Sequence, residues 1–305
     1  MINKEVKSPL VLNGKVVHIK DVSVSKIIKD YMQFGIDTSY ILKDIKSLSL
    51  YKCVSSSYEF FHPFDISGDS RFYEGLQRFD WYYMPWKWEH EITKSYLRDG
   101  HSLLEVGCAH GAFLSAINKQ VKLKTSIGLE LNQTTPKDEK TFKIINQNIQ
   151  DFQKNNYEKF DVVCSFQVLE HISEVRLFLD AKVNCLKKGG RLVISVPNNE
   201  SLLLRGDPVL NKPPHHLGRW CSTSLQYLEN VFPIKLVDMH YEPLQQYHVE
   251  SFVNEENYSR YPTVVQKVLR NIDVITGRFN KLKNKVENKR ESIIGHTVLA
   301  VFEKY

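Results

Sequence analysis

The chain has 305 residues, of which 42% are hydrophobic and 25% charged, and its formal net charge is +6. This length suits one α/β domain of about 200 residues with additions. No apolar run approaches the roughly 20 residues that span a bilayer, and the first residues lack the apolar core of a signal peptide. The five cysteines are widely spaced and form no C-x-x-C pair, which argues against a disulfide framework or a zinc ribbon. We therefore expect a reduced, cytoplasmic protein.

Residues 1–98 differ in character from the rest of the chain. Short helices are predicted over 26–32 and from residue 38, and residues 51–88 are crowded with aromatic side chains. These are Tyr58, Phe60, Phe61, Phe64, Phe72, Tyr73, Phe79, Trp81, Tyr82, Tyr83, Trp86 and Trp88. Aromatic faces pack on C–H groups while polar neighbours bind hydroxyls, so this mixture suits stacking on a sugar or another ring. A small core that covers the sheet edge would have the same composition.

Residues 103–111 have the sequence LLEVGCAHG. The apolar start predicts a buried parallel strand, and Gly107 and Gly111 predict a turn into an amphipathic helix. A strand, a glycine turn and a helix let the backbone approach a nucleotide-like ligand closely, with free N–H groups at the start of the helix.

Three features narrow the choice of ligand. Glu130 ends the next predicted strand, 23 residues after Gly107, where a carboxylate can accept hydrogen bonds from both ribose hydroxyls. Residues 112–114 lack the third glycine of the dinucleotide fingerprint. Glu105, two residues before the first glycine, is placed to face a cationic amino group. A ribose, an adenine and an ammonium group together fit S-adenosylmethionine better than a nicotinamide dinucleotide.

The later segments predict the rest of a parallel sheet. FDVVCSFQVLEH (160–171) has the pattern of a strand that enters a loop, and LKKGGRLVISVPN (186–198) that of a helix end, a Gly-Gly turn and a strand. Strands are expected at residues 102–107, 125–131, 142–148, 160–166, 190–197, 234–242 and 295–304.

At these residues the chain resembles the class I S-adenosylmethionine-dependent methyltransferases, in the branch that acts on small molecules, quinones and sugars. The resemblance implies an α/β, Rossmann-like seven-stranded sheet, parallel except for an antiparallel last strand, with helices on both faces. Ala109 stands where the family usually has glycine, and we expect cofactor binding to survive this smallest of replacements. The expected cofactor contacts are Glu105, Gly107, Cys108, Ala109, Gly111, Glu130, Leu131, Asn148, Ile149, Phe166 and Gln167.

Residues 51–89 resemble, more loosely, the N-terminal module of bacterial methyltransferases associated with surface-polysaccharide synthesis. The matching segments are YKC (51–53), FFHP (60–63), FY (72–73), WYY (81–83) and KWE (87–89). The paired cysteines of the zinc ribbon in that module are missing, so we expect no metal. The resemblance implies a sugar acceptor.

Three histidines are expected on loops at the carboxyl ends of the strands, where open α/β sheets bind ligands. His171 follows the fourth strand, and His215 and His216 follow the fifth in PPHHLGRW (213–220). A sugar hydroxyl is a poor acid, so we expect His215 or His216 to act as a base, with His171 or purely positional catalysis as alternatives. A zinc site that includes Cys221 is disfavoured because adjacent histidines rarely ligate one ion.

The acceptor is expected between this loop and the aromatic module. Arg219 and Trp220 offer an anion contact and a stacking face, and Tyr82, Tyr83 and Trp88 offer aromatic contacts from the module.

The basic character of the chain lies in residues 260–291, which contain nine basic and three acidic residues. Their net charge of +6 equals that of the whole chain. Apolar residues alternate at spacings of three and four and predict one long amphipathic helix over 262–290, with Gly277 off the apolar stripe. The stripe could pack on its own domain, form a dimer contact, or dock on an anionic surface such as a membrane or a phosphorylated glycan carrier.

These features predict an S-adenosylmethionine-dependent O-methyltransferase that acts on a sugar of a surface glycan or its precursor, phosphorylated or lipid-linked. Residues 1–98 would cover the substrate, and 99–305 would form the methyltransferase domain with insertions near 199–232 and 250–291. A nucleic-acid acceptor is not expected, because residues 165–168 lack the Asp/Asn-Pro-Pro-aromatic tetrapeptide of nucleobase amino-methyltransferases. A quinone-like or other small acceptor, or a non-catalytic cofactor-binding protein, remain alternatives, and both a monomer and a homodimer are open.

Overall fold

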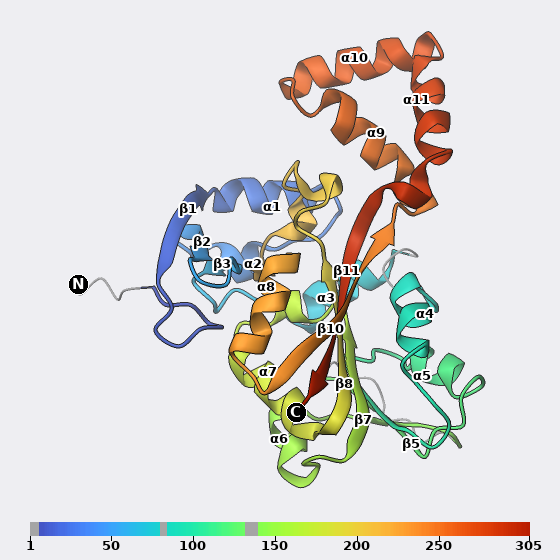
Figure 1. Cartoon of the computed structure of the whole chain (residues 1–305). Helices are drawn as coiled ribbons and strands as arrows, with labels where there is room; N and C mark the ends of the chain where they lie inside the picture. The colour runs from blue at the N-terminus through green and yellow to red at the C-terminus, as the bar shows by residue number, and fades with distance from the viewer. Residues whose placement is uncertain (1–5, 80–83, 132–139) are drawn as a thin grey trace.

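A seven-stranded sheet forms the centre of the computed structural model, which describes residues 6–79, 84–131 and 140–305 (Figure 1). Its strand order is β10-β11-β8-β7-β4-β5-β6, and the last strand, β11, is antiparallel to both of its neighbours. The pairs formed among β4, β5, β6, β7 and β8 are parallel. The strands are β4 (Ser102–Val106), β5 (Thr125–Leu129), β6 (Lys143–Ile145), β7 (Phe160–Phe166), β8 (Leu186–Pro197), β10 (Ile234–Pro243) and β11 (Ile294–Lys304). The predicted Rossmann-like sheet is confirmed.

Helices cover both faces of this sheet. Helices α4 (Trp88–Lys94) and α5 (Ala112–Ile117) lie on one side, and α6 (Ile149–Phe152), α7 (Val175–Cys185) and α8 (Ser222–Gln226) on the other (Figure 1). Strand β4 is buried along its whole length, and its residues alternate between the two layers: Leu103 packs with the α5 side and Leu104 with the α7 side. Burial on both faces is why this strand is a continuous apolar run in the sequence.

A second, smaller sheet joins the N-terminal residues to a distant loop. It contains β1 (Val16–Val22), β2 (Leu48–Cys53), β3 (Glu59–His62) and β9 (Gly218–Arg219), all paired antiparallel. Helices α1 (Val24–Met32), α2 (Ser39–Leu42) and α3 (Ser70–Gln77) flank it, and α1 and α2 confirm the two helices predicted there. Because β9 follows the histidine pair in sequence, its pairing with β3 attaches the histidine loop to the N-terminal module.

Much of the aromatic stretch forms the core of this module and is not available to a ligand. Tyr58, Phe60, Phe61 and Phe72 are at most 1% exposed. Phe61 and Phe72 lie in a core of the module itself, whereas Tyr58 and Phe60 belong to the core that includes one face of the main sheet. The division into a module 1–98 and a domain 99–305 stays a prediction.

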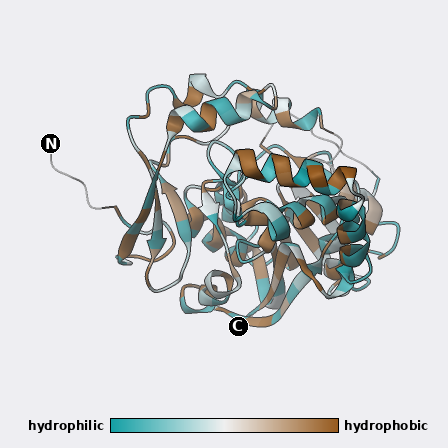
Figure 2. Ribbon diagram, turned by 90° about the horizontal axis from the view of Figure 1, so that it is seen from above, coloured by the Kyte–Doolittle hydropathy of each residue, from teal (hydrophilic) through white to brown (hydrophobic). Residues whose placement is uncertain are grey.

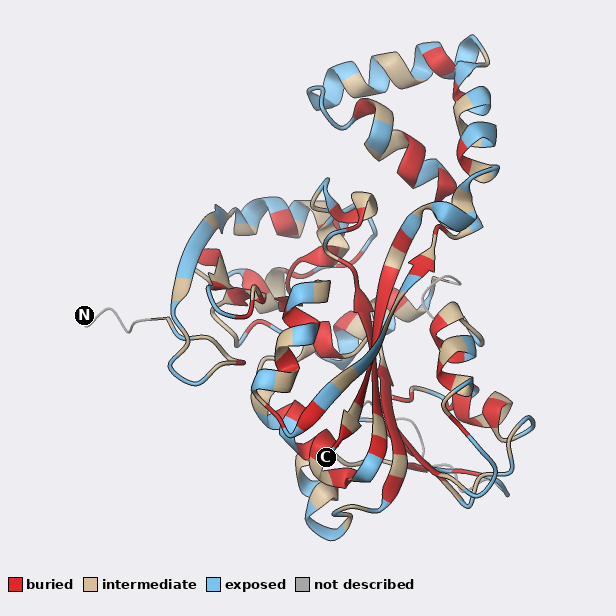
Figure 3. Cartoon of the chain, viewed as in Figure 1, coloured by how far each residue is buried: buried red, intermediate tan, exposed pale blue. Residues whose placement is uncertain are grey.

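Three helices project beyond the carboxyl end of β8: α9 (Val249–Tyr258), α10 (Thr263–Ile275) and α11 (Arg278–Glu287) (Figures 1 and 3). The single long helix predicted over 262–290 is wrong. Gly277 adopts a left-handed conformation (φ +73°), which ends the first helix and starts the second. The apolar stripe is split accordingly, because Phe279 and Val286 of α11 are buried whereas Val268 of α10 is half exposed. Among the described residues, no helix is both long and apolar enough to cross a membrane.

A fully buried lysine lies inside the main domain. The Lys182 side chain on α7 is fully buried and donates a 2.5 Å hydrogen bond to Ser165 Oγ on β7. Burial lowers the pKa of Lys182 to about 7 from its ordinary value of 10.5, because the charged amine loses its hydration.

We expect Lys182→Met to stabilise the fold by about 1–3 kcal/mol at pH 7, because methionine has a similar length and does not have to lose a proton on burial. This gain should outweigh the lost hydrogen bond to Ser165. Between pH 7 and 10 the unfolded chain binds more protons at Lys182 than the folded chain, so the wild type gains stability as pH rises. The variant should lack this increase. The free energy of unfolding, obtained by denaturant unfolding at pH 7 and at pH 10, measures the difference. The exposed Lys188→Met is the control, and an equal pH dependence in wild type and Lys182→Met would contradict the assignment.

Candidate functional site

The glycine turn between β4 and α5 has the conformation that a closely approaching ligand requires. Gly107, Ala109 and Gly111 all have positive φ angles, of 80°, 46° and 74°. A Cβ on Gly107 would lie 2.5 Å from Val168 Cγ2, so the loop after β7 packs directly on this turn. Ala109 adopts the left-handed conformation that the glycine common in the family adopts without strain.

Two carboxylates flank the turn. Glu130 accepts hydrogen bonds from the backbone N–H groups of Ala109 and Leu131, both at 2.9 Å. Glu105 is 5% exposed, and its Oε2 has no hydrogen-bond partner among the described residues. Burial, with a smaller contribution from nearby Glu130, raises the pKa of Glu105 to about 8. A buried carboxyl with an unsatisfied oxygen is costly unless a ligand supplies a donor or a cation.

The other expected cofactor contacts lie at the ends of neighbouring strands. Asn148 caps α6, where its Oδ1 accepts from Asp151 N at 2.7 Å, and Ile149 beside it is buried. Gln167, directly after β7, has a φ of 54° and donates from Nε2 to Thr297 Oγ1 at 3.4 Å. The remaining three are the buried thiol Cys108, the half-buried Phe166 and the exposed Leu131. Their contact with the cofactor stays a prediction.

The structure brings the three predicted histidines together. His171 lies at the end of the short helix after β7, and His215 and His216 lie on the loop before β9. One ring nitrogen of each lies within 4.8 Å of those of the other two. The rings of His215 and His216 are stacked with centroids 4.3 Å apart, and that of His171 lies 4.7 Å from His215.

Each of the three rings is oriented by a carbonyl oxygen that contacts Nδ1. His171 Nδ1 lies 2.6 Å from the backbone oxygen of His215, and His215 Nδ1 lies 2.9 Å from that of Leu210. His216 Nδ1 lies 3.1 Å from Asn211 Oδ1. A carbonyl oxygen only accepts, so Nδ1 carries the hydrogen in each neutral ring, and the lone pair lies on Nε2.

Burial keeps all three histidines neutral. It lowers the pKa of His171 to about 4 and holds the pKa values of His215 and His216 well below the ordinary range, where their mutual repulsion adds to the effect. A buried acid, Glu170, lies next to the histidines, with its Oε1 3.9 Å from His171 Nε2. It is 1% exposed, its Oε2 has no partner within the described chain, and burial raises its pKa to about 8.

Further ionisable groups at this edge of the sheet were missed by the sequence analysis. Glu89 on α4, Glu242 on β10 and His296 on β11 are buried or largely shielded, and burial raises the pKa of Glu242 to about 7 and lowers that of His296 to about 3. Glu89 and Glu170 occur in the KWE and VLEH segments that carried the two resemblances, which is the only signal that could have identified them.

The structure corrects two of the predicted acceptor contacts. Arg219 is 9% exposed and ion-paired with Asp207, so its guanidinium is already engaged within the fold. Trp220 is fully buried with its ring centroid 4.3 Å from that of Tyr58, so it offers no stacking face. Trp88 is half-buried at the start of α4, against the second core. Tyr82 and Tyr83 lie outside the described residues.

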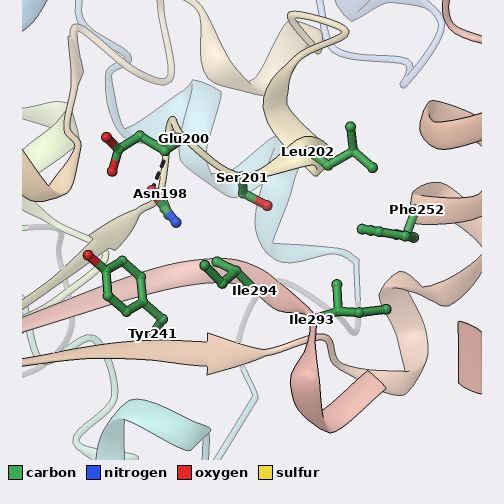
Figure 4. A pocket seen from close by; sticks show the side chains of 8 residues that line it. All are labelled: Asn198, Glu200, Ser201, Leu202, Tyr241, Phe252, Ile293 and Ile294. Carbon is green, nitrogen blue, oxygen red and sulfur yellow. Dashed lines mark hydrogen bonds between the residues drawn. The ribbon is translucent and has the colours of Figure 1, made fainter. Parts of the chain in front are cut away.

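Two hollows lie near the histidine cluster and the turn. One, of about 460 Å³, opens at the base of the projection and is lined by Asn198, Glu200, Ser201, Leu202, Tyr241, Phe252, Ile293 and Ile294 (Figure 4). Asn198 Oδ1 accepts from Glu200 N at 3.1 Å there. The neighbouring Asn199 accepts from Asn211 Nδ2 at 2.8 Å, which connects this cleft to the histidine cluster. The other, of about 520 Å³, lies behind the glycine turn beside His110 and Phe142.

The comparisons with known proteins agree with this geometry. A family model described as a methyltransferase domain matches residues 81–260, more than half of the chain. The chain belongs to this methyltransferase domain family. It is an S-adenosylmethionine-dependent methyltransferase of class I. No curated protein matches the sequence.

Solved structures resemble the chain only distantly. A Haloferax volcanii complex between the Trm112 methyltransferase activator and a methyltransferase matches with 13% identity and a TM-score of 0.49, over 71% of this chain and 88% of that one. An S-adenosylmethionine-dependent methyltransferase from Archaeoglobus fulgidus matches with 19% identity and a TM-score of 0.44, over 70% of this chain and 94% of that one. Phosphoethanolamine N-methyltransferase 2 of Haemonchus contortus, in complex with S-adenosylmethionine, matches with 15% identity and a TM-score of 0.46, over 72% and 52%. These likenesses are too weak to indicate an acceptor.

The residues around the turn fit S-adenosylmethionine. The Glu105 carboxyl, whose Oε2 has no partner in the described part of the chain, suits the ammonium group, and the Glu130 carboxylate at the end of β5 suits the ribose hydroxyls.

We expect S-adenosylhomocysteine to displace close to one proton when it binds at pH 7. Glu105 holds a proton at this pH because its pKa is about 8, and the cationic amino group favours the ionised form. Calorimetry in buffers of different ionisation enthalpy measures this release. In Glu105→Gln the release disappears, and affinity falls about 10–100-fold through loss of a charged hydrogen bond. The exposed Glu291→Gln is the control, and a proton release that persists in Glu105→Gln would disprove the role of Glu105.

Proposed function

We propose that the chain transfers the methyl group of S-adenosylmethionine to a hydroxyl of a sugar, in a surface glycan or its precursor. The observation that carries the proposal is the cluster of three neutral histidines beside the cofactor turn. Val168, three residues before His171, packs on Gly107, so the loop that carries His171 also contacts the cofactor turn. Bound S-adenosylmethionine supplies an already activated methyl group, so the protein has to position an acceptor and assist the loss of its proton.

The histidine cluster suits an acceptor that loses a proton. Each ring holds its Nδ1 hydrogen against a carbonyl oxygen and directs an Nε2 lone pair elsewhere. In the simplest form of the reaction, His215 or His216 accepts the hydroxyl proton as the new O–CH₃ bond forms. Such a group typically contributes about 10²–10⁴-fold to the rate.

The surroundings of the cluster favour a polyhydroxylated acceptor. Buried Glu89, Glu170 and Glu242 can all accept or donate hydrogen bonds at this edge of the sheet. Tyr73 of the N-terminal module lies against the cluster, with its ring centroid 5.8 Å from that of His171 and 6.2 Å from that of His215. An aromatic ring beside several polar groups is typical of a sugar site. All five cysteines are free thiols, in keeping with a reducing compartment such as the cytoplasm.

Transfer of labelled methyl from S-adenosylmethionine into extract of the source organism tests the proposal when glycan, lipid, protein and nucleic-acid pools are counted separately. We expect label in the glycan pool, and a decrease of at least about 10²-fold in the His215→Ala/His216→Ala double variant. The His18→Ala variant, altered at an exposed position on β1, should retain full activity. Unchanged S-adenosylhomocysteine affinity in the double variant would show that its fold is intact. Label confined to another pool would overturn the sugar acceptor, and no label in any pool would favour a non-catalytic cofactor-binding protein.

We also propose that the projection docks on an anionic membrane surface, where a lipid-linked glycan precursor would be found. Val264, Val265, Val268, Ile272 and Ile275 line one face of α10 and are 40–84% exposed. The ribbon of α10 accordingly has hydrophobic segments in Figure 2 and is largely exposed in Figure 3. Residues 260–291 around them carry a net charge of +6. A membrane of opposite charge satisfies both features, whereas a dimer through α10 would bring two strongly basic segments together.

Sedimentation with lipid vesicles tests this docking. The protein should sediment with phosphatidylcholine vesicles that contain phosphatidylglycerol but not with pure phosphatidylcholine, and salt should weaken binding. Val268→Ser/Ile272→Ser should abolish binding, whereas Leu177→Ser, at an equally exposed apolar position on α7, should not. A stable dimer that these two substitutions dissociate would instead assign the face to a second copy of the chain.

A further inference from the structure

The histidine cluster has the arrangement of a ligand set as well as that of a base. A single base needs one imidazole, yet three ring nitrogens from two separate loops lie within 4.8 Å of one another. Metal-binding histidines almost always donate their second ring N–H to a carbonyl or carboxylate, which fixes the ring and directs the lone pair to the ion. His171, His215 and His216 all contact such an oxygen through Nδ1, at 2.6, 2.9 and 3.1 Å.

A buried carboxyl beside the cluster is the second, independent observation. Glu170 Oε1 lies 3.9 Å from His171 Nε2, and Glu170 Oε2 has no partner within the described part of the chain. The residue is only 1% exposed, so neither oxygen is exposed to bulk water. A buried carboxyl oxygen without a partner in the described chain, next to three imidazoles whose ring nitrogens lie close together, fits a site that a cation completes.

We propose that His171, His215 and His216 form a binding site for a divalent transition-metal ion, with Glu170 beside it. Imidazole nitrogens suit zinc and its neighbours in the first transition row, whereas magnesium and calcium prefer oxygen. Three protein ligands leave a fourth position open, as in catalytic zinc sites. Zinc–nitrogen bonds of about 2.0–2.1 Å in a tetrahedral site need nitrogens about 3.3 Å apart. Because the nitrogens lie up to 4.8 Å apart, the rings would have to approach one another by as much as about 1.5 Å on binding.

We infer that the ion takes part in the proposed methyl transfer, and this part of the inference rests on the proposed function. With the three lone pairs on the metal, none of the histidines could also accept the hydroxyl proton, so the ion would replace His215 or His216 in assisting its loss. The ion would hold the acceptor oxygen at its open position, and Glu170, whose Oε1 lies 3.9 Å from His171 Nε2, could take the proton. Metal binding itself can be measured whether or not the acceptor is a sugar.

The probe is Co²⁺ added to the full-length protein, purified without a histidine tag and stripped of metal with a chelator. We expect one Co²⁺ per chain, an intense visible spectrum of four- or five-coordinate cobalt, and displacement by Zn²⁺. His171→Ala and His216→Ala should each lower affinity at least about 100-fold, and Asn211→Ala, which frees the His216 ring from its acceptor, about 10–100-fold. His18→Ala is the matched control. S-adenosylhomocysteine affinity in each variant reports whether the fold is intact.

Absence of stoichiometric Co²⁺ binding would overturn the proposal, as would a weak octahedral spectrum that persists in His171→Ala. Neither result would affect the methyltransferase assignment, which the label-transfer experiment tests separately. Stoichiometric binding together with equal label transfer by stripped and reloaded protein would keep the site but remove the ion from the reaction.

Discussion

The hydrogen bond from His171 Nδ1 to the backbone oxygen of His215 joins the two loops that carry the candidate site. It is 2.6 Å long, and a second bond beside it, from Leu217 N to the Glu170 backbone oxygen, is 2.8 Å long. The loop before β9 has no regular secondary structure of its own, so such bonds determine where its histidines lie. On its other side, Tyr31 of the N-terminal module donates to the Lys212 backbone oxygen at 3.1 Å. The site is thus held between the sheet and the module, and it needs both.

Buried acids are the second constraint at this edge of the sheet. Glu89, Glu105, Glu170 and Glu242 are all at most 5% exposed. Carboxylates taken out of water are stable only when they hold a proton or when a cation or donor compensates them. The pKa values of Glu105 and Glu170 are both raised to about 8, because burial disfavours the ionised carboxylate while no ligand is bound. A site of this kind is therefore expected to change its protonation when a cationic ligand binds.

Local sequence determined what could be predicted. The glycine turn, the strands and the positions of Glu105 and Glu130 follow from short segments whose period and spacing have one structural meaning, whereas the seven-stranded sheet was implied by the family resemblance. Trp220 was misassigned because nothing in its neighbourhood reveals that Tyr58, more than 150 residues earlier, covers its ring. The helix break at Gly277 was missed for a different reason. The energetic penalty of glycine in a helix is small, so only tertiary packing decides whether the chain continues or turns there.

The histidine cluster could not be predicted from the spacing of residues that are close together in the sequence. Adjacent histidines were judged unlikely to share an ion, and the only third ligand considered was Cys221, five residues beyond His216. The fold instead brings the His171 ring, just beyond the end of β7, to a centroid distance of 4.7 Å from the His215 ring. That approach depends on the parallel order of β7 and β8, which places both strands' carboxyl ends at one edge. The stacked pair alone would be a weak ligand set, and the third imidazole, from another loop, brings three ring nitrogens within 4.8 Å of one another. Both the base and the ion that we propose depend on this approach of the two loops.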